Sequence, residues 1–223
     1  CSSDLTGNAD TTAVTSIQSD NATGLTATAT AAGKVGFAVG DVDIADANAG
    51  SATAAGTIAT VTLGSFKGAA ADAATVNSGA LTTLNISGTG ADDLDVTAGA
   101  LTTAVVDTLA LNLNGFTHTA SAGGRAVVID ADYTTINLDS SGTASTVGEI
   151  SIAGATTLNV TGDAKATFTA STVTALKTVT VTNTAGFQMD NISATTTFTG
   201  GAGADGVTLA NATETTIAMG AGD

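Results

Sequence analysis

The sequence predicts an all-β protein folded as a right-handed parallel β-helix or β-roll-like solenoid. Two observations support this fold class. A short phrase of alternating threonine and apolar residues recurs eight times, and glycine-rich turns with aspartate follow near the C-terminal end. Helices find little support, because a period of 3.6 residues is absent. An antiparallel β-sandwich remains the alternative, since regularly spaced short strands separated by turns fit that architecture as well.

The repeated phrase indicates stacked structural units. Its apolar centres lie 23, 27, 25, 22, 21, 19 and 19 residues apart, at Val61, Leu84, Leu111, Ile136, Leu158, Val179, Phe198 and Ile217. Each unit is too small to bury its apolar face alone, so neighbours must stack, with aliphatic columns inside and threonine outside. Alternating segments between the copies, such as 126–130 and 166–169, supply further strands. We expect a solenoid over residues 50–223, and residues 1–49 as a β-rich segment that forms first rungs or a cap.

Composition limits the partners and the chemistry. The net charge of −15 argues against nucleic acid, which requires a basic surface. No apolar run reaches the roughly 18 residues of a membrane span. The single cysteine, Cys1, excludes an intrachain disulfide and is either a lipidated start or a remnant of processing. We expect no enzyme activity, because the only histidine, His118, is predicted to be a surface residue and the absence of tryptophan leaves sugars little to stack on.

The C-terminal region carries a candidate calcium site. Residues Gly200 to Val207 approximate the nonapeptide G-G-x-G-x-D-x-U-x, whose glycine-rich half turns and binds Ca²⁺ while its apolar half forms a strand. Gly200, Gly201 and Gly203 allow carbonyl oxygens to converge, and Asp205 adds a hard anionic oxygen. A second partial copy begins 19 residues after Gly201 and contains Gly220, Gly222 and Asp223. We expect the two turns to lie one above the other on one edge of the solenoid.

Two further acidic segments are candidate calcium sites. One is a shortened form of the same motif, with Gly88, Gly90, Asp92, Asp93 and Asp95. Its three carboxylates repel one another unless a cation lies between them. In the other segment, strand alternation places Asp41 and Asp43 on one face, and Asp46 completes the proposed site. The alternative for both segments is a solvated acidic surface without an ion.

Several of these phrases resemble one family. The runs at 58–66, 80–90, 109–116, 156–163 and 198–223 are similar to RTX-type surface-layer (S-layer) proteins of stalked alphaproteobacteria. The resemblance implies secretion by a type I system, a calcium-filled solenoid, and self-assembly into a lattice on lipopolysaccharide at the cell surface. It carries the calcium role to Gly200, Gly201, Gly203, Asp205, Gly220, Gly222 and Asp223. Residues 1–49 and 91–108 match poorly, so candidate ligands there depend on chemistry alone.

The expected function is therefore structural. We expect an extracellular protein that assembles with calcium into a surface layer or a surface filament, because calcium neutralises acidic turns in a chain that otherwise repels itself. One alternative is a cell-surface adhesin or stalk module that binds a glycan or another cell. A second is a β-helical enzyme acting on polysaccharide.

Overall fold

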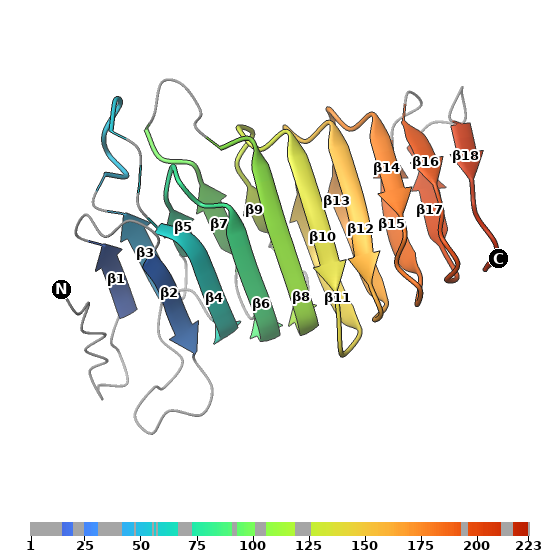
Figure 1. Ribbon diagram of the computed structural model, residues 1–223, viewed down its shortest axis with the longest axis horizontal. Helices are drawn as coiled ribbons and strands as arrows, with labels where there is room; N and C mark the ends of the chain where they lie inside the picture. The colour runs from blue at the N-terminus through green and yellow to red at the C-terminus, as the bar shows by residue number, and fades with distance from the viewer. Residues whose placement is uncertain are drawn as a thin grey trace.

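The computed structural model describes residues 15–19, 25–30, 42–46, 48–54, 56, 58–66, 73–90, 93–100, 106–118, 126–192, 196–210 and 216–222. Within these ranges the regular structure consists of eighteen strands and includes no helix. The strands form two parallel ladders that run the length of an elongated molecule (Figure 1). No helix in the described ranges has the length and apolar character needed to cross a membrane.

The chain alternates between the two ladders. The even-numbered ladder consists of β2 (Leu25–Thr30), β4 (Ile58–Phe66), β6 (Thr83–Gly90), β8 (Thr108–His118), β10 (Thr135–Ser140), β12 (Thr157–Gly162), β14 (Thr178–Val181), β16 (Thr197–Thr199) and β18 (Thr216–Ala218). The odd-numbered ladder consists of β1 (Thr15–Ser19), β3 (Val42–Asp46), β5 (Ala74–Asn77), β7 (Leu94–Thr97), β9 (Val127–Ile129), β11 (Ser145–Ser151), β13 (Ala166–Thr172), β15 (Phe187–Ile192) and β17 (Gly206–Leu209).

Every pairing between these strands is parallel, and each strand pairs with the strand two positions away in the chain. The end of β8 also pairs with β11, which links the two ladders. This arrangement confirms the predicted parallel solenoid. The β-sandwich alternative is wrong, because it requires antiparallel neighbours. Strands β1 to β3, from the segment before residue 50, pair within the same ladders.

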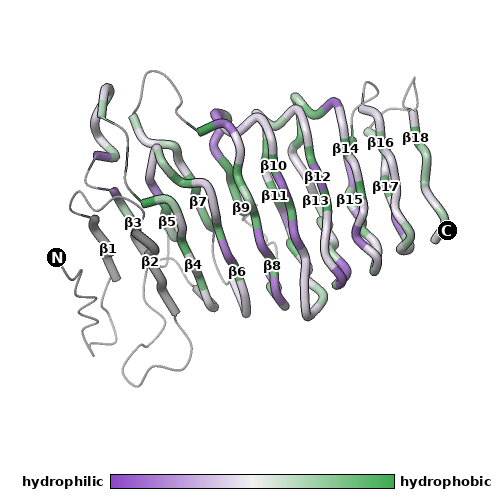
Figure 2. Tube along the Cα trace, in the orientation of Figure 1, coloured by the Kyte–Doolittle hydropathy of each residue, from purple (hydrophilic) through white to green (hydrophobic). Residues whose placement is uncertain are grey.

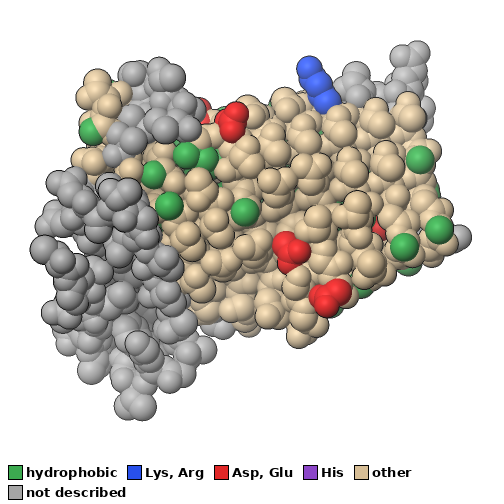
Figure 3. Space-filling view, viewed as in Figure 1, with side chains coloured by type: hydrophobic (Ala, Val, Ile, Leu, Met, Phe, Trp, Pro, Cys, Tyr) green, Lys and Arg blue, Asp and Glu red, His purple; other side chains and the backbone are tan. Residues whose placement is uncertain are grey.

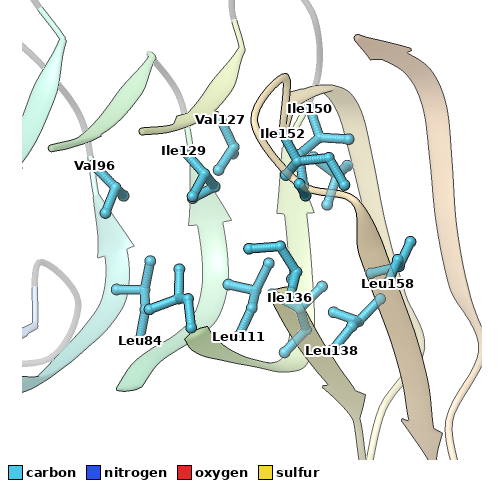
Figure 4. Packing of buried hydrophobic residues seen from close by; sticks show 14 of the residues in the cluster. Leu84, Val96, Leu111, Val127, Ile129, Ile136, Leu138, Ile150, Ile152 and Leu158 are labelled. Carbon is cyan, nitrogen blue, oxygen red and sulfur yellow. The ribbon is translucent and has the colours of Figure 1, made fainter. Parts of the chain in front are cut away.

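The core lies between the two ladders. Inward side chains of the even-numbered ladder face those of the odd-numbered ladder in stacked aliphatic columns; Figure 4 labels Leu84, Leu111, Ile136, Leu138 and Leu158 on one side and Val96, Val127, Ile129, Ile150 and Ile152 on the other. Apolar and polar residues alternate along most strands, as the colouring in Figure 2 shows. The alternation arises because successive side chains of a strand point to opposite faces.

One step of the expected alignment differs in the structure. Leu111 pairs with Leu138, and Ile136 pairs with Leu109. The expected pairing of Leu111 with Ile136 is therefore two residues out of register. Ile136 and Leu138 point to the same face, so a shift of two residues keeps the apolar pattern and alternation cannot separate the two registers. The other pairings expected between the repeated phrases are confirmed.

Candidate functional site

The two glycine-rich turns near the C-terminus stack on each other. The first turn connects β16 to β17 and contains Gly200, Gly201 and Gly203. A Cβ on Gly200 would lie 2.0 Å from the carbonyl oxygen of Met219, and a Cβ on Gly220, at φ +92°, would lie 2.0 Å from the carbonyl oxygen of Gly201. The amide of Ala221 donates to that same Gly201 oxygen at 3.0 Å. The turn–strand order and the stacking therefore agree with the nonapeptide pattern, and glycine is required because backbone occupies the space of a side chain.

Asp205 is the acidic residue of the first turn, and its side chain is only 8% exposed. Its Oδ1 atom accepts the amide N–H of Phe187 at 2.8 Å, and Oδ2 accepts the amide N–H of Gly201 at 2.7 Å. Phe187 begins β15 in the preceding rung, whereas Gly201 belongs to the same turn. The carboxylate thus connects two rungs, and the two amide dipoles stabilise its charge.

Asp46 has a similar role at the end of β3. The side chain is 3% exposed and shares the buried face with Ile44. Its Oδ2 atom accepts the amide of Ile58 at 2.7 Å, and Oδ1 accepts the amide of Asn48 at 2.9 Å. The hydroxyl of Ser78, in the next rung, lies 3.4 Å from Oδ2. Asp46 is therefore held inside the corner by protein donors. Asp41 and the side chain of Asp43 lie outside the described parts of the structure.

The third candidate set surrounds the corner between β6 and β7. Gly88 has φ +73°, and Gly90 is buried beside His118. The Oδ1 atom of Asp93 accepts the amide of Ala126 at 2.8 Å from the following rung. Burial, and then the negative charge of Asp93, raise the pKa of Asp95 above its usual value. These two carboxylates interact unfavourably, so a cation that binds hard oxygen ligands would relieve their repulsion.

The remaining candidate ligands are not brought together in the described structure. Asp92 and Asp223 lie outside the described residues. Within those residues, no three histidine, cysteine, aspartate or glutamate side chains form a group suited to a metal ion. A calcium site built from the described residues alone would therefore combine one or two carboxylates with carbonyl oxygens from glycine turns.

Two other corner residues have the same structural role: Asn183, which the sequence does not indicate as a candidate, and Asp130, which the sequence indicates only as a weaker candidate for calcium. The buried Asn183 donates from Nδ2 to the carbonyls of Thr161 (3.0 Å) and Ala164 (2.8 Å), and its Oδ1 accepts the amides of Ala185 and Gly186 at 2.8 Å. Asp130 accepts the amide of Ala98 from the preceding rung at 2.9 Å. A useful signal is an Asp, Asn or Ser at or just after a strand end, because such side chains bind the amide two residues later.

His118 is buried rather than on the surface. It is 1% exposed, and its ring lies 6.2 Å from that of Phe116 at an interplanar angle of 20°. The expectation of a surface residue is wrong because Phe116 and His118, two residues apart, share the inward face of β8. Burial lowers the pKa of His118, while the charges of Asp93 and Glu149 act in the opposite direction.

A shallow groove crosses the odd-numbered ladder near its C-terminal end. It is lined by polar side chains that include Thr167, Gln188, Asp190 and Thr208, with Phe168 among the apolar lining residues. Comparison with models of known protein families gives no match, and no curated protein is significantly similar to the chain. The functional argument therefore depends on the geometry of this solenoid and on its residues.

Proposed function

We propose that this chain is a structural protein of the cell surface that assembles, in the presence of calcium, into an S-layer lattice or a surface filament. The observation that carries the proposal is the regular stack of parallel rungs with acidic residues repeated at its corners. Such a stack presents long, repetitive surfaces suited to contacts between copies. The resemblance of several repeated phrases to RTX-type S-layer proteins supports the extracellular location and lipopolysaccharide as a surface partner.

Calcium has a specific place in this proposal. Asp93 and Asp95 are the described carboxylates best suited to the ion, because burial, and then the negative charge of Asp93, raise the pKa of Asp95. Bound calcium would neutralise this repulsion with hard oxygen ligands. At Asp205 the amides of Phe187 and Gly201 already stabilise the charge, so an ion there would add coordination by the turn carbonyls. Lower net charge would then favour contact between chains that carry −15 each.

The test is assembly of the purified protein with millimolar calcium and with excess EGTA. We expect sheets or filaments in electron micrographs with calcium, and smaller particles after chelation. Asp95→Asn should weaken the calcium response, whereas Asp163→Asn, an exposed residue at a different corner, serves as the matched control. Circular dichroism and particle size that stay unchanged in EGTA would refute the calcium dependence.

A cell-surface adhesin that binds a glycan is the second candidate, and the groove over β13, β15 and β17 favours it. The hydroxyl, amide and carboxylate groups that line the groove suit hydrogen bonding to a sugar. This candidate differs in its outcome: the protein stays monomeric in calcium and binds a glycan from an array. Gln188→Ala, at an exposed groove position, should then abolish glycan binding without changing the circular dichroism spectrum.

A further inference from the structure

The even-numbered ladder contains a long stretch with uninterrupted register. From β8 through β10, β12, β14 and β16 to β18, each residue pairs directly with its counterpart in the next strand. By contrast, the pairings among β2, β4, β6 and β8 each contain a register shift. Outward side chains in the C-terminal stretch therefore form straight columns across six strands.

Two adjacent outward columns in this stretch have an unusual composition. The first contains only threonine: Thr108, Thr135, Thr157, Thr178, Thr197 and Thr216. The second contains Ala110, Asn137, Asn159, Thr180, Thr199 and Ala218. We call these two columns the threonine array. The array contains no charged residue although the chain carries a net charge of −15, and the face toward the viewer in Figure 3 shows few charged side chains over these strands.

The side chains of the array are held in place but leave hydroxyls available. Threonine is β-branched, so its χ1 angle is restricted on a strand. Asn159 donates to Asn137 at 2.9 Å, which orders the second column. Within the described structure, the hydroxyls of Thr157, Thr178 and Thr197 form no hydrogen bond, and Thr178 and Thr197 are exposed. The array therefore presents regularly placed methyl and hydroxyl groups to water.

The repeat distances point to an ordered lattice as the ligand. Neighbouring strands lie about 4.8 Å apart, and residues two positions apart along a strand lie about 6.7 Å apart. Both distances approximate oxygen repeats on the surface planes of hexagonal ice. Methyl groups order the water around them, hydroxyls continue its hydrogen bonding, and the absence of charge avoids strongly held, differently oriented hydration water. We propose that the threonine array adsorbs to ice.

Two other occupants of a flat polar face fit less well. A polysaccharide surface is normally bound by aromatic side chains, and the array has none. A second copy of the chain would leave exposed threonine and asparagine side chains to find partners across the contact, without an apolar centre. Adsorption to ice requires a regular and uncharged surface, which the unshifted register and the composition of the array provide. The proposal is separate from calcium-dependent assembly, because it depends on side chains of the ladder face and not on the acidic corners.

The test measures ice adsorption by the full chain in calcium-containing buffer. We expect the protein to concentrate in a slowly growing ice hemisphere. We also expect it to lower the freezing temperature of ice below its melting temperature and to slow the recrystallisation of ice. Thr178→Lys places a charged, longer side chain at the centre of the array and should abolish all three effects. The matched control is Thr172→Lys on β13, an exposed threonine of the other ladder, which should retain them. Circular dichroism establishes that both variants are folded.

A second variant tests the contribution of the threonine methyl group separately from that of the hydroxyl group. Thr178→Ser keeps the hydroxyl but removes the methyl group, and it should reduce the temperature gap partly rather than abolish it. The proposal is overturned if the wild-type protein is excluded from ice, or if Thr178→Lys retains wild-type adsorption. It is equally overturned if the array mediates dimers or binding to crystalline cellulose while ice adsorption is absent. Loss of assembly in EGTA with ice adsorption retained would support both proposals, because assembly depends on the acidic corners and adsorption on the ladder face.

Discussion

The bonding of Asp205 predicts how the solenoid responds when this carboxylate is removed. Asp205→Ala leaves the amides of Phe187 and Gly201 without their acceptors. Hydrogen bonds to a charged group contribute about 1.5 to 3 kcal/mol each, and these two groups are buried or partly buried. We therefore expect a destabilisation of about 3 kcal/mol. Asp205→Asn keeps one carbonyl acceptor and should lose about half as much.

Urea unfolding followed by circular dichroism measures the change in the free energy of unfolding. Hydrogen exchange provides the local measurement, because the amide of Phe187 should lose protection in Asp205→Ala. Asp163→Ala is the control, since Asp163 is exposed and accepts a single amide, that of Gly142, at 3.0 Å. We expect this control to change stability only slightly.

Calcium provides the condition that separates the two roles of Asp205. If the carboxylate acts as an acceptor for amides, the loss is the same in calcium and in EGTA, and Asp205→Asn is milder than Asp205→Ala. If it acts only through an ion, both variants lose the same free energy in calcium and neither loses any in EGTA. The second result would refute the reasoning from the hydrogen bonds.

Three further predictions follow from individual residues. The pKa of Asp95 is raised in the folded state, so the free energy of unfolding falls as pH rises above the usual pKa of an aspartate. Asp95→Asn removes this ionisation, so it should raise the melting temperature at pH 7 in EGTA and have little effect at pH 3. The pKa of His118 is lowered, so stability is lost as pH falls through the ordinary histidine pKa of 6.5, and His118→Gln should flatten the profile of melting temperature between pH 7.5 and 5.5. Gly162 has φ +107°, and a Cβ there would lie 2.0 Å from the carbonyl oxygen of Ser140. Gly162→Ala should therefore lower the free energy of unfolding by more than the ~1 to 2 kcal/mol that a left-handed conformation costs a residue with a side chain. Gly50→Ala is the control in the same urea titration and should be nearly neutral, because a Cβ there would meet nothing within 4 Å.

Much of the fold could be predicted from the sequence, because the repeated phrase indicates both the strands and their stacking. The alternation in each copy indicates strands, and the recurrence of copies indicates stacking. The register between Leu111 and Leu138 could not be predicted, because apolar residues at 136 and 138 satisfy the inward face equally well. The polarity of His118 favours the surface, but its position two residues after Phe116 on the same strand places it on the inward face.

The corners were harder to predict than the strands. The sequence places Asp205 in a glycine-rich turn and Asp46 next to an alternating strand segment, but it does not show which backbone amides oppose them. The partner of Asp205 is Phe187, 18 residues earlier, and the partner of Asp46 is Ile58, 12 residues later. These separations in the sequence depend on turn lengths, which vary from rung to rung. The chemistry of a carboxylate therefore predicts that each charge is stabilised by a cation or a hydrogen-bond donor. The structure shows that backbone amides are such donors at both residues.

The varying length of each turn has a consequence for how such a chain can change over time. Strands paired without a register shift are offset in the sequence by as few as 19 positions, for Thr197 and Thr216, and by as many as 33, for Leu94 and Val127. Extra residues are accommodated at the corners, without moving the ladder above or below. A gene encoding this protein could therefore gain or lose a few codons at a corner, or duplicate a whole coil, and still specify a continuous rod of different length.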